Sequence, residues 1–346
     1  MKKRIFTAIV AMLAVAGAVN AQSDYQMNVI TSDGQALAFD ANNLISVTFS
    51  KKPVAVEAKS GADLAEVWAA VDKENVPSVT IKLEKDGEYT VSAPIVTAIP
   101  LTIEGNGAKI TATTNIVELE AAPEGVVGYI NDITFKDAFI SCSKSLFYSQ
   151  GKGNLIFNLN VINCILAQVA DATTVDFTKG SAVANFNILN STVYAATATT
   201  KAFFSSQSGQ RITELNAEGI QKFDFENSTF YNLAKSKNFF THRQNNQKWL
   251  AYTVKNNIFV NCGKNGQVIK GMNGGQSGKN PIWDIDGNLF NFDGDDGVRT
   301  DTNEAESTGD DDEPIKNSVA GVVAFEDADN GNFKQSAFEI GDPRWF

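Results

Sequence analysis

The sequence reads Phe223-Asp-Phe-Glu-Asn-Ser-Thr-Phe-Tyr231 and, one repeat further on, Tyr252-Thr-Val-Lys-Asn-Asn-Ile-Phe-Val260. In both stretches apolar and polar residues alternate, an Asn follows, and a second short apolar segment comes next. The pattern recurs with its Asn, Asp or Gly at positions 105, 137, 163, 190, 227, 256 and 287, at intervals of 26 to 37 residues. An alternation of period two predicts strands, and a repeat of this length predicts a solenoid in which each repeat forms one coil.

A third apolar segment completes each repeat, as in Leu146-Phe-Tyr148 and Val175-Asp-Phe177. Three strands per repeat predict a three-sided coil, and equal positions of successive coils should stack about 4.8 Å apart. Asn suits the turn because it tolerates the left-handed backbone conformation and because stacked amides hydrogen-bond one another. We therefore predict an all-β protein, a right-handed parallel β-helix of about seven or more rungs, over residues 55–292.

We predict a helix over residues 61–73. It should cover the N-terminal end of the coil, because an open end is an unpaired edge that needs covering. Helical spacing places apolar residues on one face of this segment. These residues are Leu64, Val67, Trp68 and Val71. Before the helix, residues 22–52 predict a small β module around the turn at Asp33-Gly34.

The composition changes after the last repeat. Residues 293–316 are dominated by Asp and Glu, which is typical of a solvated loop. Residues 317–346 regain apolar periodicity and end on Gly341-Asp-Pro-Arg-Trp-Phe346. We expect this last segment to form a C-terminal cap.

The first 21 residues carry a basic start, an apolar run and then small residues. This order is typical of a secretory signal peptide, and the run is shorter than the roughly 20 residues that span a bilayer. We expect cleavage after Ala21, export to the periplasm, the cell surface or the medium, and a monomeric mature protein without a membrane span. The net charge of −11 for the whole chain argues against a nucleic-acid partner.

The helix at 61–73, the segment Leu101-Thr-Ile-Glu-Gly-Asn-Gly-Ala-Lys-Ile110 and the Asn-bearing repeats together resemble the pectin-lyase-like superfamily of right-handed parallel β-helices. The N-terminal module and the closing Gly341-Asp-Pro-Arg-Trp345 look, more narrowly, like uncharacterised secreted β-helix proteins of Bacteroides-type bacteria. Such proteins often accompany polysaccharide-degradation genes. The resemblance implies the fold and an involvement with polysaccharides, but a fold does not by itself define an activity.

The enzyme motifs of that superfamily are absent from this chain. Its pectate lyases carry Arg-x-Pro-x-x-Arg, which does not occur here, and its polygalacturonases carry aspartate motifs followed by Gly-His-Gly. Asp295-Asp296 is similar to one aspartate motif, but the single histidine, His242, precedes it. A lyase or hydrolase would need an unfamiliar site, for which we consider His242, Arg243 and Lys248, since a histidine beside an arginine can act as a general base.

In this superfamily the binding cleft usually lies on the third strand of each rung. The side chains predicted to face outward there, and hence to bind a glycan, are Tyr148, Lys179, Lys201, Phe204, Phe240 and Lys270. Exposed aromatic rings stack on sugars and lysines pair with uronate or sulfate groups, so this mixture favours an acidic polysaccharide. The alternative is that the Phe rings are inside or covered and that the lysines are scattered surface charges.

Carboxylates on the first strands of consecutive rungs form a second candidate site. Stacked oxygens could hold Ca²⁺, and the candidate ligands on these strands are Asp224, Glu226, Asp284 and Asp286. Asp293 and Asp295, in the acidic segment after the last repeat, are further candidates because that segment has a calcium-like composition without the EF-hand order. The alternative is a ladder of opposite charges that includes Lys255. No other cofactor is expected.

Three functions remain open. We favour binding of a polysaccharide without chemistry, because aromatic candidates are present and the known catalytic motifs are not. A polysaccharide lyase or glycoside hydrolase with an unfamiliar site is the first alternative. A structural or adhesive protein at the cell surface is the second.

Overall fold

The computed structural model describes residues 26–30, 36–40, 52–74, 76–124, 126–151, 155–206, 220–242, 249–264, 268, 282–291, 315–316 and 322–346. The chain divides into two compact units, Met1–Ser50 and Lys51–Phe346. The described part of the first unit is an antiparallel hairpin of β1 (Gln26–Ile30) and β2 (Ala36–Asp40). The expected signal peptide lies outside the described residues. None of the helices among the described residues has the length and apolar character needed to cross a bilayer.

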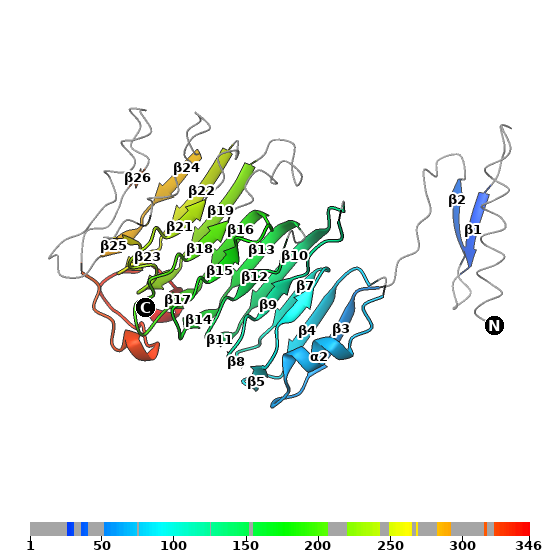
Figure 1. Ribbon diagram of the computed structural model, residues 1–346, viewed down its shortest axis with the longest axis horizontal. Helices are drawn as coiled ribbons and strands as arrows, with labels where there is room; N and C mark the ends of the chain where they lie inside the picture. The colour runs from blue at the N-terminus through cyan, green and yellow to red at the C-terminus, as the bar shows by residue number, and fades with distance from the viewer. Residues whose placement is uncertain are drawn as a thin grey trace. The chain divides into compact units, whose positions relative to one another are not determined.

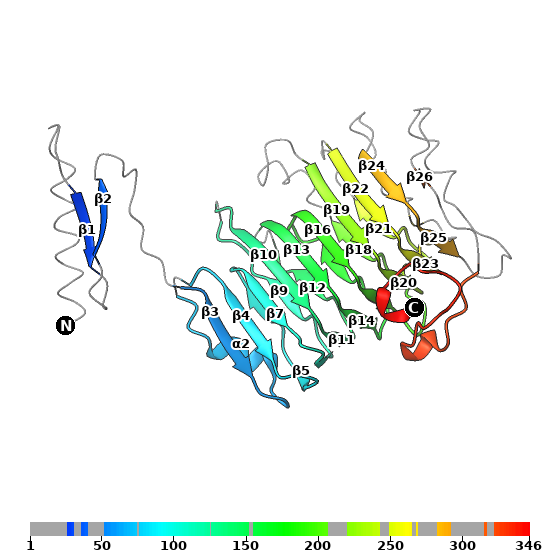
Figure 2. The same ribbon diagram turned by 180° about the vertical axis from the view of Figure 1, so that it is seen from behind.

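The second unit is a parallel β-helix whose rungs pass through three sheets in turn (Figures 1 and 2). The described strands of the first sheet are β3 (Val54–Ala58), β4 (Val79–Leu83), β7 (Leu101–Glu104), β10 (Tyr129–Lys136), β13 (Leu155–Ile162), β16 (Val183–Leu189), β19 (Ile220–Glu226), β22 (Trp249–Lys255), β24 (Ile282–Asp286) and β26 (Ile315–Lys316). Those of the second are β5 (Glu88–Val91), β8 (Lys109–Ala112), β11 (Phe139–Cys142), β14 (Ile165–Gln168), β17 (Thr192–Tyr194), β20 (Thr229–Tyr231), β23 (Ile258–Val260) and β25 (Leu289–Asn291). Those of the third are β6 (Ile95–Thr97), β9 (Val117–Leu119), β12 (Phe147–Ser149), β15 (Val175–Phe177), β18 (Phe204–Ser206) and β21 (Phe240–His242).

Neighbouring strands in each sheet pair in parallel, so the predicted three-sided parallel β-helix is confirmed. The first sheet reaches further than expected, because β26 pairs with β24 inside the segment predicted to be a solvated loop. The rest of that loop, residues 293–314, lies outside the described residues.

The turn between the first and second sheets is built on left-handed residues at the predicted positions. Asn163, Asn190, Asn227 and Asn256 have φ values of 52°, 49°, 50° and 55°. Their side chains stack from rung to rung: the Asn227 amide donates to Asn190 Oδ1 and the Asn256 amide to Asn227 Oδ1, both at 3.3 Å. The predicted asparagine ladder is therefore confirmed.

A second polar ladder runs beside the first and is fully buried. The backbone N–H of Ser191 donates to Ser228 Oγ at 3.1 Å, that of Ser228 to Asn257 Oδ1 at 2.9 Å, and that of Asn257 to Asn288 Oδ1 at 2.9 Å. These four side chains have no exposed surface. They satisfy backbone donors at the corner, which could not otherwise be buried without cost.

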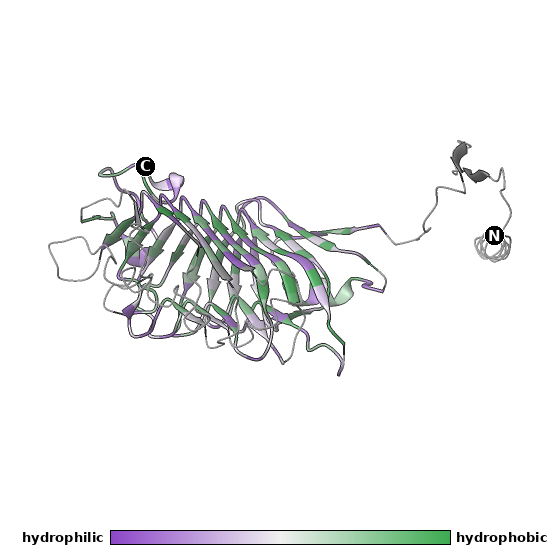
Figure 3. Cartoon of the chain, turned by 90° about the horizontal axis from the view of Figure 1, so that it is seen from above, coloured by the Kyte–Doolittle hydropathy of each residue, from purple (hydrophilic) through white to green (hydrophobic). Residues whose placement is uncertain are grey.

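Hydrophobic and hydrophilic residues alternate along the strands (Figure 3), and the apolar ones fill the tube. Phe203, Phe204, Phe239 and Phe240 belong to this core, with at most 2% of their surface exposed. The prediction that Phe204 and Phe240 face outward is therefore wrong. The strands of the third sheet start at a corner where two consecutive residues both point inward, and the first outward positions come one residue later, at Ser205 and Thr241, which pair in register.

The predicted N-terminal plug is α2 (Leu64–Ala70), whose Asp63 side chain accepts from the Ala65 N–H at 2.9 Å and thereby caps the helix. Leu64 and Trp68 are buried, and the Trp68 indole N–H donates to the Val96 carbonyl at 2.9 Å. The helix therefore packs its apolar face on the first rungs, as its spacing predicts.

The segment expected to be a C-terminal cap lies along the side of the coil. Val323 packs against Ile258 and Leu289, and Phe333 packs against Tyr194 and Ala167 on the outer face of the second sheet. The short 3-10 helices η5 (Ala328–Asn330) and η6 (Pro343–Trp345) shape this tail.

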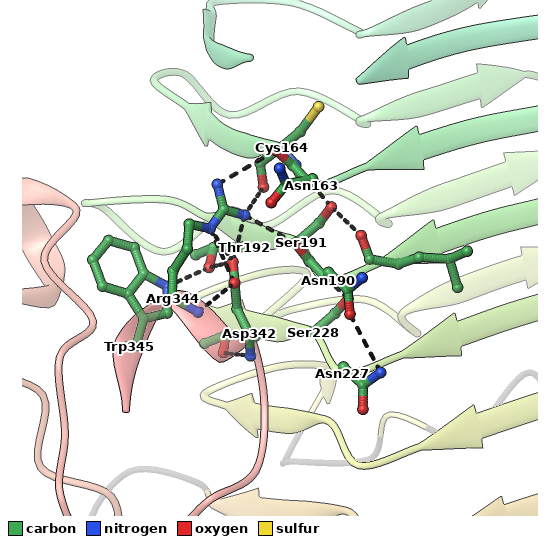
Figure 4. Close-up of polar contacts among 12 residues, drawn as sticks. Asn163, Cys164, Asn190, Ser191, Thr192, Asn227, Ser228, Asp342, Arg344 and Trp345 are labelled. Carbon is green, nitrogen blue, oxygen red and sulfur yellow. Dashed lines mark hydrogen bonds and ion pairs between the residues drawn. The ribbon is translucent and has the colours of Figure 1, made fainter. Parts of the chain in front are cut away.

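The last residues clamp the tail to three rungs (Figure 4). The buried Asp342 carboxylate accepts from Arg344 at 2.6 Å and from the Thr192 hydroxyl at 2.7 Å. The Arg344 guanidinium also donates to the carbonyls of Cys164 and Asn190 at 2.9 and 3.0 Å, and the Trp345 indole donates to Thr192 Oγ1 at 2.7 Å. Side chains within the last five residues, 342–346, thus hold a long stretch of chain in place.

Candidate functional site

Tyr148 lies on the outer face of the third sheet, between two carboxylates. The register pairs it with Glu118 on one side and Asp176 on the other, and all three side chains are partly exposed. Burial raises the pKa of the Tyr148 hydroxyl, and the charges of Asp176 and Glu118 raise it further. Tyr148 is therefore a neutral ring that offers a hydroxyl beside two acceptors.

Neutral side chains hold these carboxylates in place. The Asn115 and Gln150 amides donate to the two oxygens of Glu118, each at 2.7 Å. The Thr178 hydroxyl donates to Asp176 at 2.6 Å. The outer face of the third sheet thus presents fixed oxygen acceptors with amide groups around them.

The lysines expected to flank this face do not converge on it. Lys179 and Lys201 are both exposed. Lys179 follows β15 and Lys201 precedes β18, so they lie at opposite ends of the parallel strands of the third sheet. Lys270, Arg243 and Lys248 lie outside the described residues. His242 ends β21, and nothing is described of its side chain. The catalytic role considered for this group stays a prediction.

An exposed apolar patch lies at the corner where the chain passes from the third sheet to the first. This corner patch consists of Val126, Val127, Tyr129 and Phe157. The exposed fractions of Val126, Val127 and Tyr129 are 54%, 40% and 48%. The rings of Tyr129 and Phe157, on neighbouring rungs, have centroids 6.1 Å apart and planes 28° apart.

A backbone hydrogen bond and a small apolar cluster hold this pair of rings in position. The Leu155 N–H donates to the Gly128 carbonyl at 2.8 Å, which sets the register of β10 and β13 next to the rings. Phe157 packs on a small apolar cluster formed by Leu155, Ala182 and Ala184. Phe157 is therefore anchored, and Tyr129 stacks on it with half of its surface facing solvent.

Sequence reasoning missed this pair. The repeat predicts inside and outside positions for the four residues before each turn Asn, and Tyr129 and Phe157 precede that part of their strands. The alternation of buried and exposed residues in β13 breaks between Ile156 and Asn158, so period two does not extend to the ring positions. The strands that carry the two rings, β10 and β13, have eight residues each and are longer than their neighbours in the first sheet. This extra length is the signal that points to the ring positions.

The candidate Ca²⁺ ligands among the described residues are Asp224, Glu226, Asp284 and Asp286, on strands β19 and β24 of the first sheet. Among the described residues, no three Asp, Glu, His or Cys side chains gather closely enough to hold a metal ion. Lys255 lies opposite both Glu226 and Asp286, and it forms an ion pair with Asp284 at 2.6 Å. These pairings match the alternative to a Ca²⁺ site, a cross-strand ladder of opposite charges. Asp293 and Asp295 lie outside the described residues.

The same register row runs along the whole first sheet and is charged except at two apolar positions. In order, its residues are Glu57, Lys82, Glu104, Lys136, Ile162, Leu189, Glu226, Lys255, Asp286 and Lys316. Signs alternate on both sides of the apolar pair, and Lys136 contacts Glu104 at 3.0 Å. Opposite charges directly across neighbouring strands stabilise a sheet.

Asp224 lies outside this ladder, in the row where it stands opposite Asn187 and Thr253. Its Oδ1 is buried without a hydrogen-bond partner. Burial raises the pKa of the Asp224 carboxyl, and the nearby Glu226 and Asp284 raise it further while Lys255 lowers it. A carboxyl beside other carboxyls and with a raised pKa is a candidate proton donor.

No family model, curated protein or solved structure matches this chain. The architecture can be stated without such a relative, since the sheets and their registers define it. The chain is a three-sided parallel β-solenoid, a fold compatible with the β-helix superfamily that its sequence resembles.

Proposed function

We propose that this protein is exported and binds a polysaccharide at the corner patch. One observation carries the proposal: Tyr129 and Phe157 form a pair of nearly parallel rings on neighbouring rungs, and Tyr129 is 48% exposed. Aromatic rings with one exposed side provide large, rigid and apolar contacts at low entropic cost, which suits the apolar faces of sugar rings.

The third sheet supports the proposal with polar groups. Tyr148, Glu118 and Gln150 lie on or next to the strands that lead into β10 and β13. A binding site typically combines apolar contact area with a few well-placed polar groups that fix the ligand's orientation. Phe204 and Phe240 have no part in the site because they are buried.

The experiment is a binding screen of the purified protein against neutral, anionic and cationic polysaccharides. Tyr129→Ala should weaken binding about tenfold or more, since stacking residues at the centre of a site contribute most of the affinity. Tyr129→Phe should retain most of it, because the ring remains. Val322→Ala is the matched control, since Val322 is an exposed apolar residue, 58% exposed, in the C-terminal tail.

Unchanged binding by Tyr129→Ala would contradict the proposed site. A protein that binds no polysaccharide would contradict the proposed function and would favour the structural or adhesive alternative. Thermal unfolding of each variant separates loss of the site from loss of the fold.

Hydrolysis of the bound polymer is a second candidate, favoured by Asp224. This carboxyl has a raised pKa and faces outward on the same strand as Glu226, and glycoside hydrolysis requires one protonated and one ionised carboxyl. Release of reducing ends that disappears in Asp224→Asn and in Glu226→Gln would support it. A bound polymer that stays intact would leave the protein as a binding module.

A further inference from the structure

We infer that the polysaccharide site extends from the corner patch across the outer face of the first sheet, along strands β13 and β16. The extension rests on the proposed function and specifies where the rest of the polymer lies. The two strands are neighbours in the sheet (Figure 1), and Phe157 of the corner patch belongs to β13. The outward-facing residues that continue the site, which we name the amide strip, are Asn158, Asn160, Ile162, Asn185, Asn187 and Leu189.

The alternating charges of the first sheet are interrupted on these two strands. Neither Leu155–Ile162 nor Val183–Leu189 contains a Lys, Arg, Asp or Glu. Ile162 and Leu189 occupy the register row in which Lys136 precedes them and Glu226 follows. A Glu and a Lys at these two positions would continue the alternation, which stabilises a sheet. Apolar side chains that are partly exposed there indicate contact with a ligand instead.

The asparagine side chains of the strip form two short rows that run from rung to rung. The Asn185 amide donates to Asn158 Oδ1 at 2.8 Å, and the Asn187 amide donates to Asn160 Oδ1 at 2.7 Å. The rows continue onto β10, where the acceptors of Asn158 and Asn160 are Asp132 and Thr134, both at 2.9 Å. These hydrogen bonds fix the orientation of the amides before any ligand binds.

Oriented amides suit the hydroxyl groups of a sugar. An Asn amide has two N–H donors, and each row uses one of them, so the second can point toward a ligand. A hydroxyl accepts from such a donor and can itself donate to an amide oxygen. Because the amides are already ordered, binding requires little further loss of side-chain entropy. Phe157 at one end and Ile162 at the other add apolar contact area, which a binding site combines with a few fixed polar groups.

The shape of the strip indicates the direction of the polymer. Phe157 and Ile162 are five residues apart on β13, which corresponds to about 17 Å along a strand, whereas two neighbouring strands lie only about 5 Å apart. Charged side chains of both signs border the strip, and they are Asp132, Lys136, Lys179, Lys222, Asp224 and Glu226. The borders therefore do not fix the charge of the polymer, but they leave room for one extended chain that runs parallel to the strands.

The double variant Ile162→Glu with Leu189→Lys tests the strip. It continues the alternation between Lys136 and Glu226 and leaves the net charge unchanged, so the fold should keep its thermal stability. It also places two charged side chains on the strip, where a polymer would have to displace their water. The affinity for a polymer that crosses the strip should fall about tenfold or more.

The matched control adds the same two charges to the same sheet away from the strip. Ala55→Glu with Thr80→Lys places them on β3 and β4, where the two residues pair in register. This control should bind as the wild-type chain does, within about twofold. Asn160→Ser with Asn187→Ser is a second test that adds no charge, and it should weaken binding about threefold or more because two amide donors are lost.

Fragments of different length separate the strip from the corner patch. The probes are galactan, dextran, polygalacturonate and chitosan, each as a disaccharide and a hexasaccharide, bound to the full mature chain. The hexasaccharide of a polymer that binds should have about tenfold or more the affinity of its disaccharide, since only the longer fragment crosses the strip. The Ile162→Glu and Leu189→Lys variant should lose this gain and keep the disaccharide affinity. Tyr129→Ala should weaken both fragments.

The outcomes distinguish the strip from the proposed function. A hexasaccharide gain that persists in both strip variants, while Tyr129→Ala still weakens binding, would overturn the extension and leave the corner patch as the site. If the charged variant unfolds, the serine variant alone decides in the same way. A wild-type chain that binds none of the probes would overturn the proposed function and the extension with it.

Discussion

The asparagines at the turn between the first and second sheets have two structural roles. They adopt the left-handed conformation, as shown by the φ of 50° at Asn227, and they bond their neighbours along the ladder. Other residues with a Cβ pay about 1–2 kcal/mol for this conformation, whereas Gly does not. Substitutions at this corner can therefore separate the stability due to the left-handed conformation from the stability due to the ladder hydrogen bonds.

Replacing Asn227 by Ala should lower the free energy of unfolding by about 1–2 kcal/mol, because both the conformation and the ladder bonds suffer. Asn227→Gly should cost less, since it loses only the bonds. Unfolding in urea of the two variants, measured side by side, checks this order. Equal losses, or a larger loss for Gly, would mean that the ladder bonds and not the left-handed backbone explain the Asn.

Asp224 gives a pH-dependent prediction at the same scale. Its pKa is raised in the folded protein, so the folded state binds a proton more readily than the unfolded state, and stability falls as pH rises from the unfolded pKa of about 4 through the folded value. Asp224→Asn should therefore stabilise the protein at neutral pH by about 0.5 kcal/mol, and the gain should vanish at pH values below about 4.

Thermal unfolding at both pH values measures this gain. Asp286→Asn is the matched control: Asp286 lies between Lys255 and Lys316 in register, so neutralising it removes attraction and should not stabilise. A gain for Asp224→Asn that is as large in acid as at neutral pH would refute the account of its charge.

Single residues were predictable from the sequence where local chemistry decides. The Asn turns depend on the intrinsic conformational freedom of Asn, and the repeat reveals them. Phe204 and Phe240 were not predictable in this way, because the direction of a side chain at a corner depends on where the backbone bends. The same bend hides the exposure of Tyr129, which lies ahead of the regular alternation in its strand.

At the scale of elements, the C-terminal tail shows how a segment can be held by few contacts. The Asp342 side chain has no exposed surface, and the Arg344 side chain is 30% exposed. The pair and its hydrogen bonds to Thr192, Cys164 and Asn190 form one network. Removing one partner of a buried pair leaves the other charge uncompensated.

Asp342→Ala should therefore lower the free energy of unfolding by about 2 kcal/mol or more and should release the tail. Limited proteolysis should cut the variant between residues 322 and 346 while the coil stays intact. Glu326→Ala, which removes the exposed Glu326–Lys334 pair, should cost less than about 1 kcal/mol and leave the tail resistant. A resistant tail in Asp342→Ala would show that the apolar contacts of Val323 and Phe333 suffice.

The sequence predicts that the tail packs somewhere but not where. Apolar periodicity at 317–346 requires a partner surface, and the outer face of the second sheet provides one only because Tyr194, Tyr231 and Ile258 point outward there. That face is assembled from rungs far apart in the chain, so no local pattern identifies it. The helix α2, in contrast, packs on the rungs that follow it directly and was predictable from spacing.

At the scale of the whole molecule, the solenoid gives each of its faces a different chemistry. The second sheet is covered in part by the tail, and the first bears a ladder of alternating charges. The third sheet and its corner with the first carry the exposed Tyr129 and the partly exposed Tyr148 and Phe157. The repeated rungs produce these three faces. The candidate site differs from them because the strands depart from the regular alternation at the corner patch.

Amide hydrogen exchange tests the central claim, polysaccharide binding at the corner patch, most directly. The full mature chain would be compared with and without a saturating fragment of the polysaccharide that the binding screen identifies. Exchange should slow at residues 126–131 and 155–158 and stay unchanged in the tail at 322–346, since binding protects the amides it covers. Slower exchange confined to other parts of the chain, with the corner unaffected, would contradict the account.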